Sequence, residues 1–106
     1  MKNVFVRIDD RLLHGQVVVS WIPYLRAKEV VIADDEYAND EFMSELIKSS
    51  GPEGVIVHVK TIDETAAYLS DDNQNKILVL LRSIEGIKKL IKKTKISSIN
   101  IGGVGA

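Results

Sequence analysis

Positions 77–81 read Ile-Leu-Val-Leu-Leu, an unbroken apolar run that ends at Arg82 and Ser83. A strand covered on both faces has this pattern, whereas a strand with one face in water alternates apolar and polar residues. Both faces are typically covered in parallel sheets, because the helices that connect parallel strands pack on them. The run therefore predicts a central strand of an α/β sheet.

Working outward, short runs rich in β-branched residues occur at 4–8, 29–33, 55–59 and 98–101. Their starts recur every 20–25 residues or so, roughly the length of a βα unit with short connections. The run at 29–33 is also continuously apolar after its first residue. We expect an α/β fold: an open, doubly wound, mainly parallel sheet with helices on both faces.

The segments between these runs have helical spacing. Thr61 and Glu64 form a capping box for the third helix, and Ser83 is a good N-cap for the fourth. Gly51 suits a left-handed residue that closes the second helix. The expected apolar faces are Val17, Val18, Trp21, Ile22 and Leu25 in the first helix, Phe42, Met43, Leu46 and Ile47 in the second, and Ile84, Ile87, Leu90 and Ile91 in the fourth.

Length and composition bound the function. A chain of 106 residues is expected to form one domain, 1–106. With 14 basic and 15 acidic residues, its net charge of −1 gives no bulk attraction to nucleic acid or membranes. The absence of cysteine excludes disulfides, thiol catalysis and thiolate metal sites. No signal peptide is visible and no apolar run approaches the roughly 20 residues of a membrane span, so we expect a soluble cytoplasmic protein.

Polar residues follow the predicted strands repeatedly. Open α/β sheets bind ligands at the carboxyl ends of their strands, where this sequence has 9–14, 34–36, 82–83 and 102–103. We expect these four sets to lie on one edge, with Asp35, Ser83, Gly102 and Gly103 as candidate binding residues. Helix capping is the simpler role for Ser83, and for at least one of Asp34 and Asp35.

The densest of these sets is 7–17, which reads Arg-Ile-Asp-Asp-Arg-Leu-Leu-His-Gly-Gln-Val. Neutral imidazole is a nucleophile at physiological pH, and a helix N-terminus favours both a bound anion and the neutral ring of His14. Arg11 and Arg7 supply the planar donors that a transferring phosphoryl group needs. The pattern predicts a phosphohistidine site.

The neighbouring residues have supporting roles on this interpretation. Asp9 or Asp10 would hold the other ring nitrogen, and Gly15 would let a phosphate approach the backbone. A metal site is disfavoured, because the arginines would oppose a cation and no second histidine is near in sequence. The alternative interpretation is a surface or capping histidine among solvated ion pairs.

Two other features have structural explanations. His58 lies within a predicted strand, so we expect a structural or partly buried histidine rather than a catalytic one. Lys88, Lys89, Lys92, Lys93 and Lys95 cluster late in the fourth predicted helix, where they complement its dipole. A solvated face is the simple interpretation of the cluster, and docking of an acidic partner patch is the alternative.

The segment 7–17 resembles the phosphorylation-site signature of the enzyme IIB components of the mannose/fructose/sorbose family of the bacterial phosphotransferase system (PTS). The resemblance extends through Trp21, residues 31–35 and residues 100–103, and so covers essentially the whole chain. It implies that His14 is the phosphorylated histidine, through Nδ1, and that Arg11 is the motif arginine beside it. Asp9, Asp10 and Gln16 are also motif positions. The family fold is likewise an open α/β sheet.

The resemblance further implies a phosphotransferase that needs no cofactor or metal. Its partners would be a phosphorylated IIA domain as donor and the membrane IIC and IID subunits that bring in the sugar. The protein would therefore be cytoplasmic and peripherally associated with the permease. Family members usually continue beyond residues 102–103, so we expect a chain truncated at its C-terminus. An exposed sheet edge leaves homo-oligomerisation open.

Two rival functions come from other classes. One is a non-enzymatic regulatory or ligand-binding domain, such as a receiver-like module phosphorylated on Asp34 or Asp35. The other is a nucleotide-binding domain, which is disfavoured because no glycine-rich phosphate loop follows a strand.

Overall fold

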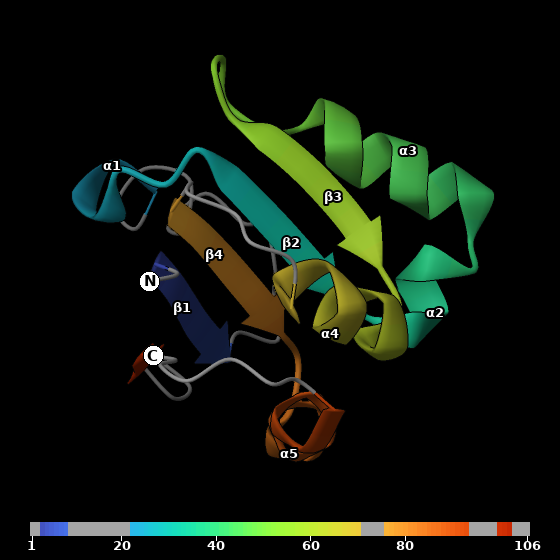
Figure 1. The fold of residues 1–106 in the computed structure, drawn as a ribbon. Coiled ribbons are helices and arrows are strands. Elements are labelled where there is room, and N and C mark those ends of the chain that lie inside the picture. Colours follow the sequence, from blue (N-terminus) through green and yellow to red (C-terminus); the bar gives the residue numbers. More distant parts are fainter. Residues whose placement is uncertain (1–2, 9–21, 71–75, 94–99, 103–106) are drawn as a thin grey trace.

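The computed structural model describes residues 3–8, 22–70, 76–93 and 100–102. Five strands form one sheet in the order β3-β2-β4-β1-β5, and the four strand pairs are parallel. Their bounds are Asn3–Ile8 for β1, Glu29–Ala33 for β2, Ile56–Lys60 for β3, Lys76–Leu81 for β4 and Asn100–Gly102 for β5. The predicted α/β fold is confirmed, and β4 is the central strand (Figure 1).

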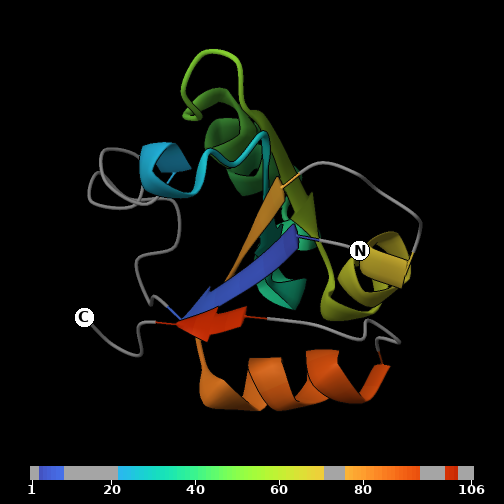
Figure 2. The ribbon, with the colours of Figure 1, turned by 60° about the vertical axis from the view of Figure 1, so that its left-hand side comes forward.

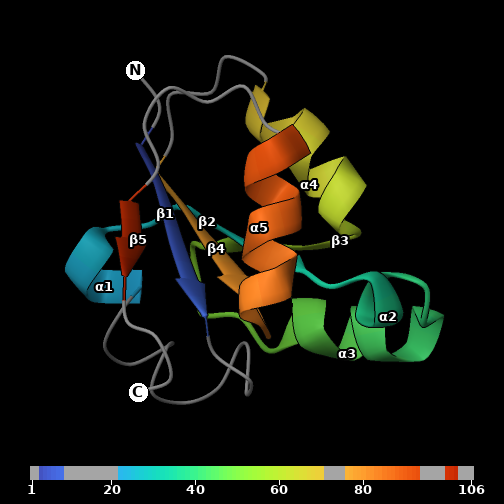
Figure 3. The same ribbon diagram turned by 90° about the horizontal axis from the view of Figure 1, so that it is seen from below.

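Five helical segments connect the strands within the described ranges. They are α1 (Ile22–Leu25), α2 (Asp35–Ala38), α3 (Glu41–Ser49), α4 (Ile62–Ser70) and α5 (Ile84–Lys93). Helices α4 and α5 lie side by side on one face of the sheet (Figure 3). Helix α1 lies on the opposite face (Figure 2), where Tyr37 of α2 and Ile47 of α3 also pack. The sheet is doubly wound, as predicted.

The core consists of two layers that sandwich the sheet. Alternate residues of β4 enter opposite layers, with Val79 and Leu81 under α4 and α5, and Leu78 and Leu80 under the other face. Strand β2 divides in the same way and is buried along its whole length. The unbroken apolar runs therefore occur where two helical layers need apolar contacts, because neither face of these strands meets water.

Two of the predicted apolar helix faces were too wide. Phe42 and Leu46 are 74% and 52% exposed, and Ile84 and Ile91 are 50% and 44% exposed. Ile87 and Leu90 are buried, whereas Met43 and Ile47 are only partly buried. The described structure buries a narrow stripe of each helix, so the flanking apolar residues remain in contact with solvent.

Of the capping predictions for the second and third helices, one is confirmed and one is wrong. Thr61 and Glu64 form the predicted capping box, with Glu64 N–H donating to Thr61 Oγ1 at 3.0 Å and Thr61 N–H donating to Glu64 Oε1 at 2.9 Å. Gly51 is not left-handed; among the residues that the structure describes, the glycine with positive φ is Gly54, at 83°. Gly51 is instead needed for close packing, because a Cβ there would lie 2.4 Å from Val57 Cγ2.

No helix in the described ranges is long and apolar enough to cross a membrane.

Candidate functional site

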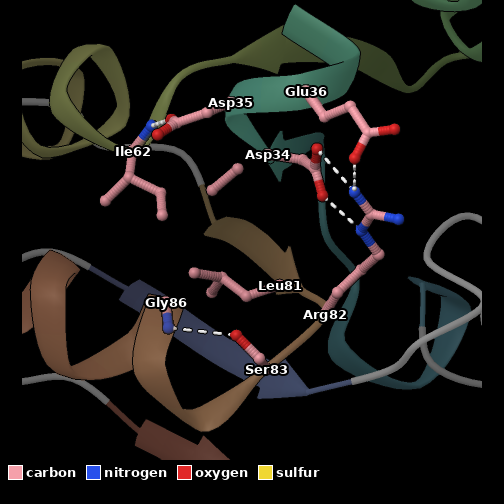
Figure 4. Close-up of a pocket in the computed structure, with 9 residues that line it drawn as sticks. Asp34, Asp35, Glu36, Ile62, Leu81, Arg82, Ser83 and Gly86 are labelled. Atoms are coloured by element: carbon pink, nitrogen blue, oxygen red, sulfur yellow. Dashed lines mark hydrogen bonds and ion pairs between the residues drawn. The ribbon is translucent and has the colours of Figure 1, made fainter.

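A pocket of about 230 Å³ opens at the carboxyl edge of the sheet, between the ends of β2 and β4. The chain turns toward α2 on one face after β2 and toward α5 on the other face after β4, so the pocket lies at a topological switch point of the sheet. Figure 4 shows the lining residues, which are Ala33, Asp34, Asp35, Glu36, Ile62, Leu81, Arg82, Ser83 and Gly86.

Asp34 connects the ends of β2 and β4. Its Oδ1 accepts a hydrogen bond from Tyr37 N–H at 2.9 Å and so caps α2. The guanidinium of Arg82 donates from Nε to Oδ2 at 2.5 Å and from Nη2 to Oδ1 at 3.1 Å. Asp34 is buried, so this two-pronged pair holds Arg82 in a defined orientation.

Arg82 has two further neighbours in α2. Nη2 also donates to Glu36 Oε2 at 3.1 Å, and the guanidinium carbon lies 4.6 Å from the centre of the Tyr37 ring. Hydrogen bonding to Asp34 raises the pKa of Arg82 further above its already high value, so this side chain is a permanent cation at the pocket rim.

Asp35 lines the pocket, but its carboxylate is engaged. Oδ1 accepts a hydrogen bond from Ile62 N–H at 2.8 Å, at the start of α4, and Oδ2 lies 3.4 Å from Lys89 Nζ of α5. The backbone hydrogen bond from Ile62 lowers the pKa of Asp35, partly opposed by burial and aided by Lys89. Asp34 and Asp35 thus both complete helix N-termini, in agreement with the capping role expected for at least one of them.

Ser83 is the predicted N-cap of α5. Its Oγ accepts a hydrogen bond from Gly86 N–H at 3.2 Å. A Cβ on Gly86 would lie 3.0 Å from Leu81 Cδ2, so glycine permits the close approach of α5 to the end of β4. Ser83 also lines the pocket, although its hydroxyl already serves the helix.

Strand β1 ends beside β4 at the same edge. Ile8 is in register with Leu81, and Arg7 is in register with Leu80 on one side and Gly102 on the other. Arg7 is 6% exposed. The other predicted site residues lie outside the described residues: Asp9, Asp10, Arg11, His14, Gly15, Gln16 and Gly103. The segment that contains His14 therefore leaves β1 next to the exit of β4.

Sequence reasoning did not select Arg82 as a site residue. The available signal was its position, since it is the charged residue between the apolar run 77–81 and a helix N-cap. Its partners lie 46 and 48 residues away in sequence, and only the strand order brings them together.

The lysines late in α5 form an exposed surface, as expected, but two of them make ion pairs with other helices. Besides the contact of Lys89 with Asp35, Lys93 Nζ lies 3.1 Å from Asp63 Oδ1 of α4. Lys95 lies outside the described residues. Part of the cluster therefore helps to hold α5 against its neighbours.

His58 is a partly buried histidine, as predicted. Its Nε2 lies 2.9 Å from Oε1 of the buried Glu29, and its ring centre lies 5.1 Å from that of Tyr68. Tyr68 donates its hydroxyl to the same Glu29 oxygen. These contacts give His58 a structural role at the start of β2.

Comparison with known proteins agrees with this fold. The family model described as "PTS system sorbose subfamily IIB component" matches residues 3–106 of this chain. The N-acetylgalactosamine-specific phosphotransferase enzyme IIB component 2 of Escherichia coli is 33% identical over 108 residues, which cover 98% of this chain and 68% of that protein. The sorbose-specific EIIB component of Klebsiella pneumoniae is 30% identical, with coverage of 98% and 65%.

Solved structures give the same result. The crystal structure of manxB from Thermoanaerobacter tengcongensis has a TM-score of 0.79 and 36% identity, and covers 100% of this chain and 66% of its own. That of the IIBSor domain of the sorbose permease from Klebsiella pneumoniae has a TM-score of 0.80 and 28% identity, with coverage of 100% and 67%. The chain spans about two thirds of the length of most of these relatives. It belongs to the sorbose subfamily of PTS IIB components.

Proposed function

We propose that this chain is a phosphohistidine carrier, which accepts a phosphoryl group from a phosphorylated IIA domain and passes it to a sugar during PTS uptake. The observation that carries the proposal is the family match over residues 3–106, which includes the whole segment 7–17. The parallel register of β1 and β4 supports it, because this segment starts at the edge where open α/β sheets bind ligands.

The chemistry is an in-line displacement at phosphorus. A neutral ring nitrogen of His14 forms a bond to phosphorus as the donor nitrogen–phosphorus bond breaks. The donor imidazole leaves with the electron pair of that bond and gains a proton, and the ring of His14 gives up the proton from its other nitrogen. Arg11 and Arg7 stabilise the charge on the equatorial oxygens, and Asp9 or Asp10 orients the imidazole. Gly15, Gln16, Gly102 and Gly103 are the further binding residues of this proposal.

The partners follow from the relay. One relative, from Escherichia coli, is named a mannose-specific EIIAB component, and this chain corresponds to 31% of its length. We propose a separate or fused IIA domain as donor and membrane IIC and IID subunits as the delivery site for the sugar, with the carrier on the cytoplasmic side. These assignments predict transient complexes at the edge that contains the carboxyl ends of β1 and β4.

In the receiver-like alternative, Asp34 or Asp35 would be phosphorylated, but both carboxylates have structural roles in this structure. Asp34 accepts hydrogen bonds from Arg82 and Tyr37, and Asp35 accepts one from Ile62. Either carboxylate would lose these bonds on phosphorylation, and α2 or α4 would lose a cap.

The test is phosphorylation in a reconstituted relay of phosphoenolpyruvate, the general PTS proteins and a IIA domain. The parent chain should take up label that is lost in acid and stable in alkali, whereas an acyl phosphate is lost in both. His14→Ala should take up none. Label on His14→Ala at the parent level, or label lost in alkali as that of an acyl phosphate would be, contradicts the proposal.

A further inference from the structure

Two arginines lie on the same face of the sheet at the carboxyl edge. In β1, Val4, Val6 and Ile8 pack under α4 and α5, whereas Phe5 packs in the opposite layer, so alternation places Arg7 on the Phe5 side. Arg82 lies on this side too, since it stacks on Tyr37 of that layer.

The register brings these two arginines close together. Arg7 is paired with Leu80, and Arg82 follows two residues later along the same chain. Arg82 directly follows β4, which ends at Leu81, so the two residues lie diagonally across the β1–β4 pair at the point where the chain leaves β1. Diagonal neighbours on one face are within reach of long side chains, so the two cations can serve a single anion.

Asp34 holds Arg82 by only one edge of the guanidinium. Nε and Nη2 bind Asp34, and Nη2 also binds Glu36. The hydrogen bonds of Arg82 to the described residues come from Nε and Nη2 and not from Nη1, and Figure 4 shows the remaining nitrogen directed away from both carboxylates. The side chain is 34% exposed, so an anion can reach this nitrogen from solvent.

We propose that Arg82 is a phosphoryl-binding residue of the transfer site, oriented by Asp34 and donating from Nη1 to a phosphoryl oxygen at the exit of β1. This inference rests on the proposed phosphocarrier function. Arg82 forms and breaks no covalent bond and keeps its proton, because its role is to stabilise charge on the oxygens while phosphorus moves between two nitrogens.

Asp34 and Glu36 differ in how strongly they compete with a phosphoryl group for Arg82. Glu36 is 78% exposed, so water and salt screen its charge and its bond to Arg82 is readily exchanged. Asp34 is buried, and its two hydrogen bonds keep the guanidinium of Arg82 in one orientation. An incoming phosphoryl group can therefore replace Glu36 without displacing Asp34.

The experiment measures single-turnover phosphoryl uptake from phosphorylated IIA, together with the pKa of the phosphoryl group in the phosphorylated carrier by ³¹P NMR. Arg82→Gln should slow uptake at least about tenfold and raise the phosphoryl pKa, because a neighbouring cation favours the dianion. Arg26→Gln is the matched control: it also removes one exposed arginine, which lies before β2 at the opposite edge. It should change neither value.

Arg82→Lys keeps the positive charge but loses the planar, two-pronged hydrogen bonding of the guanidinium. It should retain most of the lowering of the phosphoryl pKa while uptake is slower than in the parent. This variant also serves if Arg82→Gln fails to fold, as judged by its thermal unfolding. The inference is overturned if Arg82→Gln has a parent-like phosphoryl pKa and an uptake rate within twofold of the parent. It is also overturned if the phosphoryl pKa of Arg82→Lys is as high as that of Arg82→Gln. Arg82 would then be a structural ion pair.

His14→Ala separates this inference from the proposed function. If His14→Ala takes up no label and Arg82→Gln is unaffected, only the role of Arg82 is wrong. If His14→Ala is still labelled, the phosphocarrier assignment itself is wrong, and the inference about Arg82 is overturned with it.

Discussion

The two ends of strand β2 use a buried carboxylate in different ways. At the first residue, Glu29 Oε1 contacts His58 Nε2 and receives the Tyr68 hydroxyl, so β2, β3 and α4 meet around one oxygen. Beyond the last residue, Asp34 binds Arg82, whose outer edge faces a pocket. The first arrangement stabilises the fold, whereas the second presents a cation. We therefore expect substitutions at Glu29 to affect stability and substitutions around Asp34 to affect transfer.

The largest effect on stability should come from Glu29→Ala. Removing the carboxylate leaves His58 and the Tyr68 hydroxyl without their shared acceptor in a buried site, and we expect a loss of about 3 kcal/mol in the free energy of unfolding. Denaturant unfolding measures it. Glu29→Gln keeps the shape and one acceptor oxygen, so it should lose less than Glu29→Ala. Equal losses would show that the retained shape and acceptor oxygen contribute nothing and that the loss comes from the missing carboxylate charge.

A smaller effect is expected for Tyr68→Phe. The ring contacts with His58 and the cation–π contact with Lys60 Nζ at 5.0 Å are retained, and only the hydroxyl is lost. We expect a loss of about 1 kcal/mol in the free energy of unfolding, as for a typical hydrogen bond within a protein. Phosphoryl uptake below the unfolding transition should stay at the parent rate. Slower uptake would contradict the claim that the Glu29 end of β2 serves only stability.

The smallest effect concerns acid stability at Asp35. Its folded-state pKa lies below the ordinary value of 3.8, so the ionised carboxylate stabilises the fold above that value, and this contribution is lost as the pH falls through the folded-state pKa. The side chain is about half exposed, so the contribution should be below about 1 kcal/mol. Asp35→Asn should therefore show a weaker dependence of unfolding free energy on pH in this acid range than the parent. An identical dependence would contradict the Ile62 hydrogen bond as the cause.

The sequence predicted the features that depend on neighbouring residues. The bounds of β2 are those expected, and the Thr61 capping box and the Ser83 cap both form, because each is decided within a few positions of the chain. The resemblance of residues 7–17 identified the family from a short motif.

The features that depend on tertiary structure were not predictable in this way. The pairing of Arg82 with Asp34 requires β4 to lie next to β2, an order that local patterns do not encode. The exposure of Phe42 and Ile84 depends on how each helix is rotated against the sheet. Gly51 was assigned from its place after a helix, whereas its packing against Val57 arises from the next strand.

The contrast between structural and chemical groups applies most directly to the two histidines. His58 has its imidazole against Glu29 and Tyr68, and His14 belongs to the segment that leaves β1 at the carboxyl edge. The most direct measurement is to phosphorylate the chain in the relay, digest it under alkaline conditions and locate the phosphoryl group by fragmentation of the peptides. The phosphoryl group should be on His14 and absent from the peptide that contains His58; a phosphoryl group on His58, Asp34 or Asp35 would contradict the assignment.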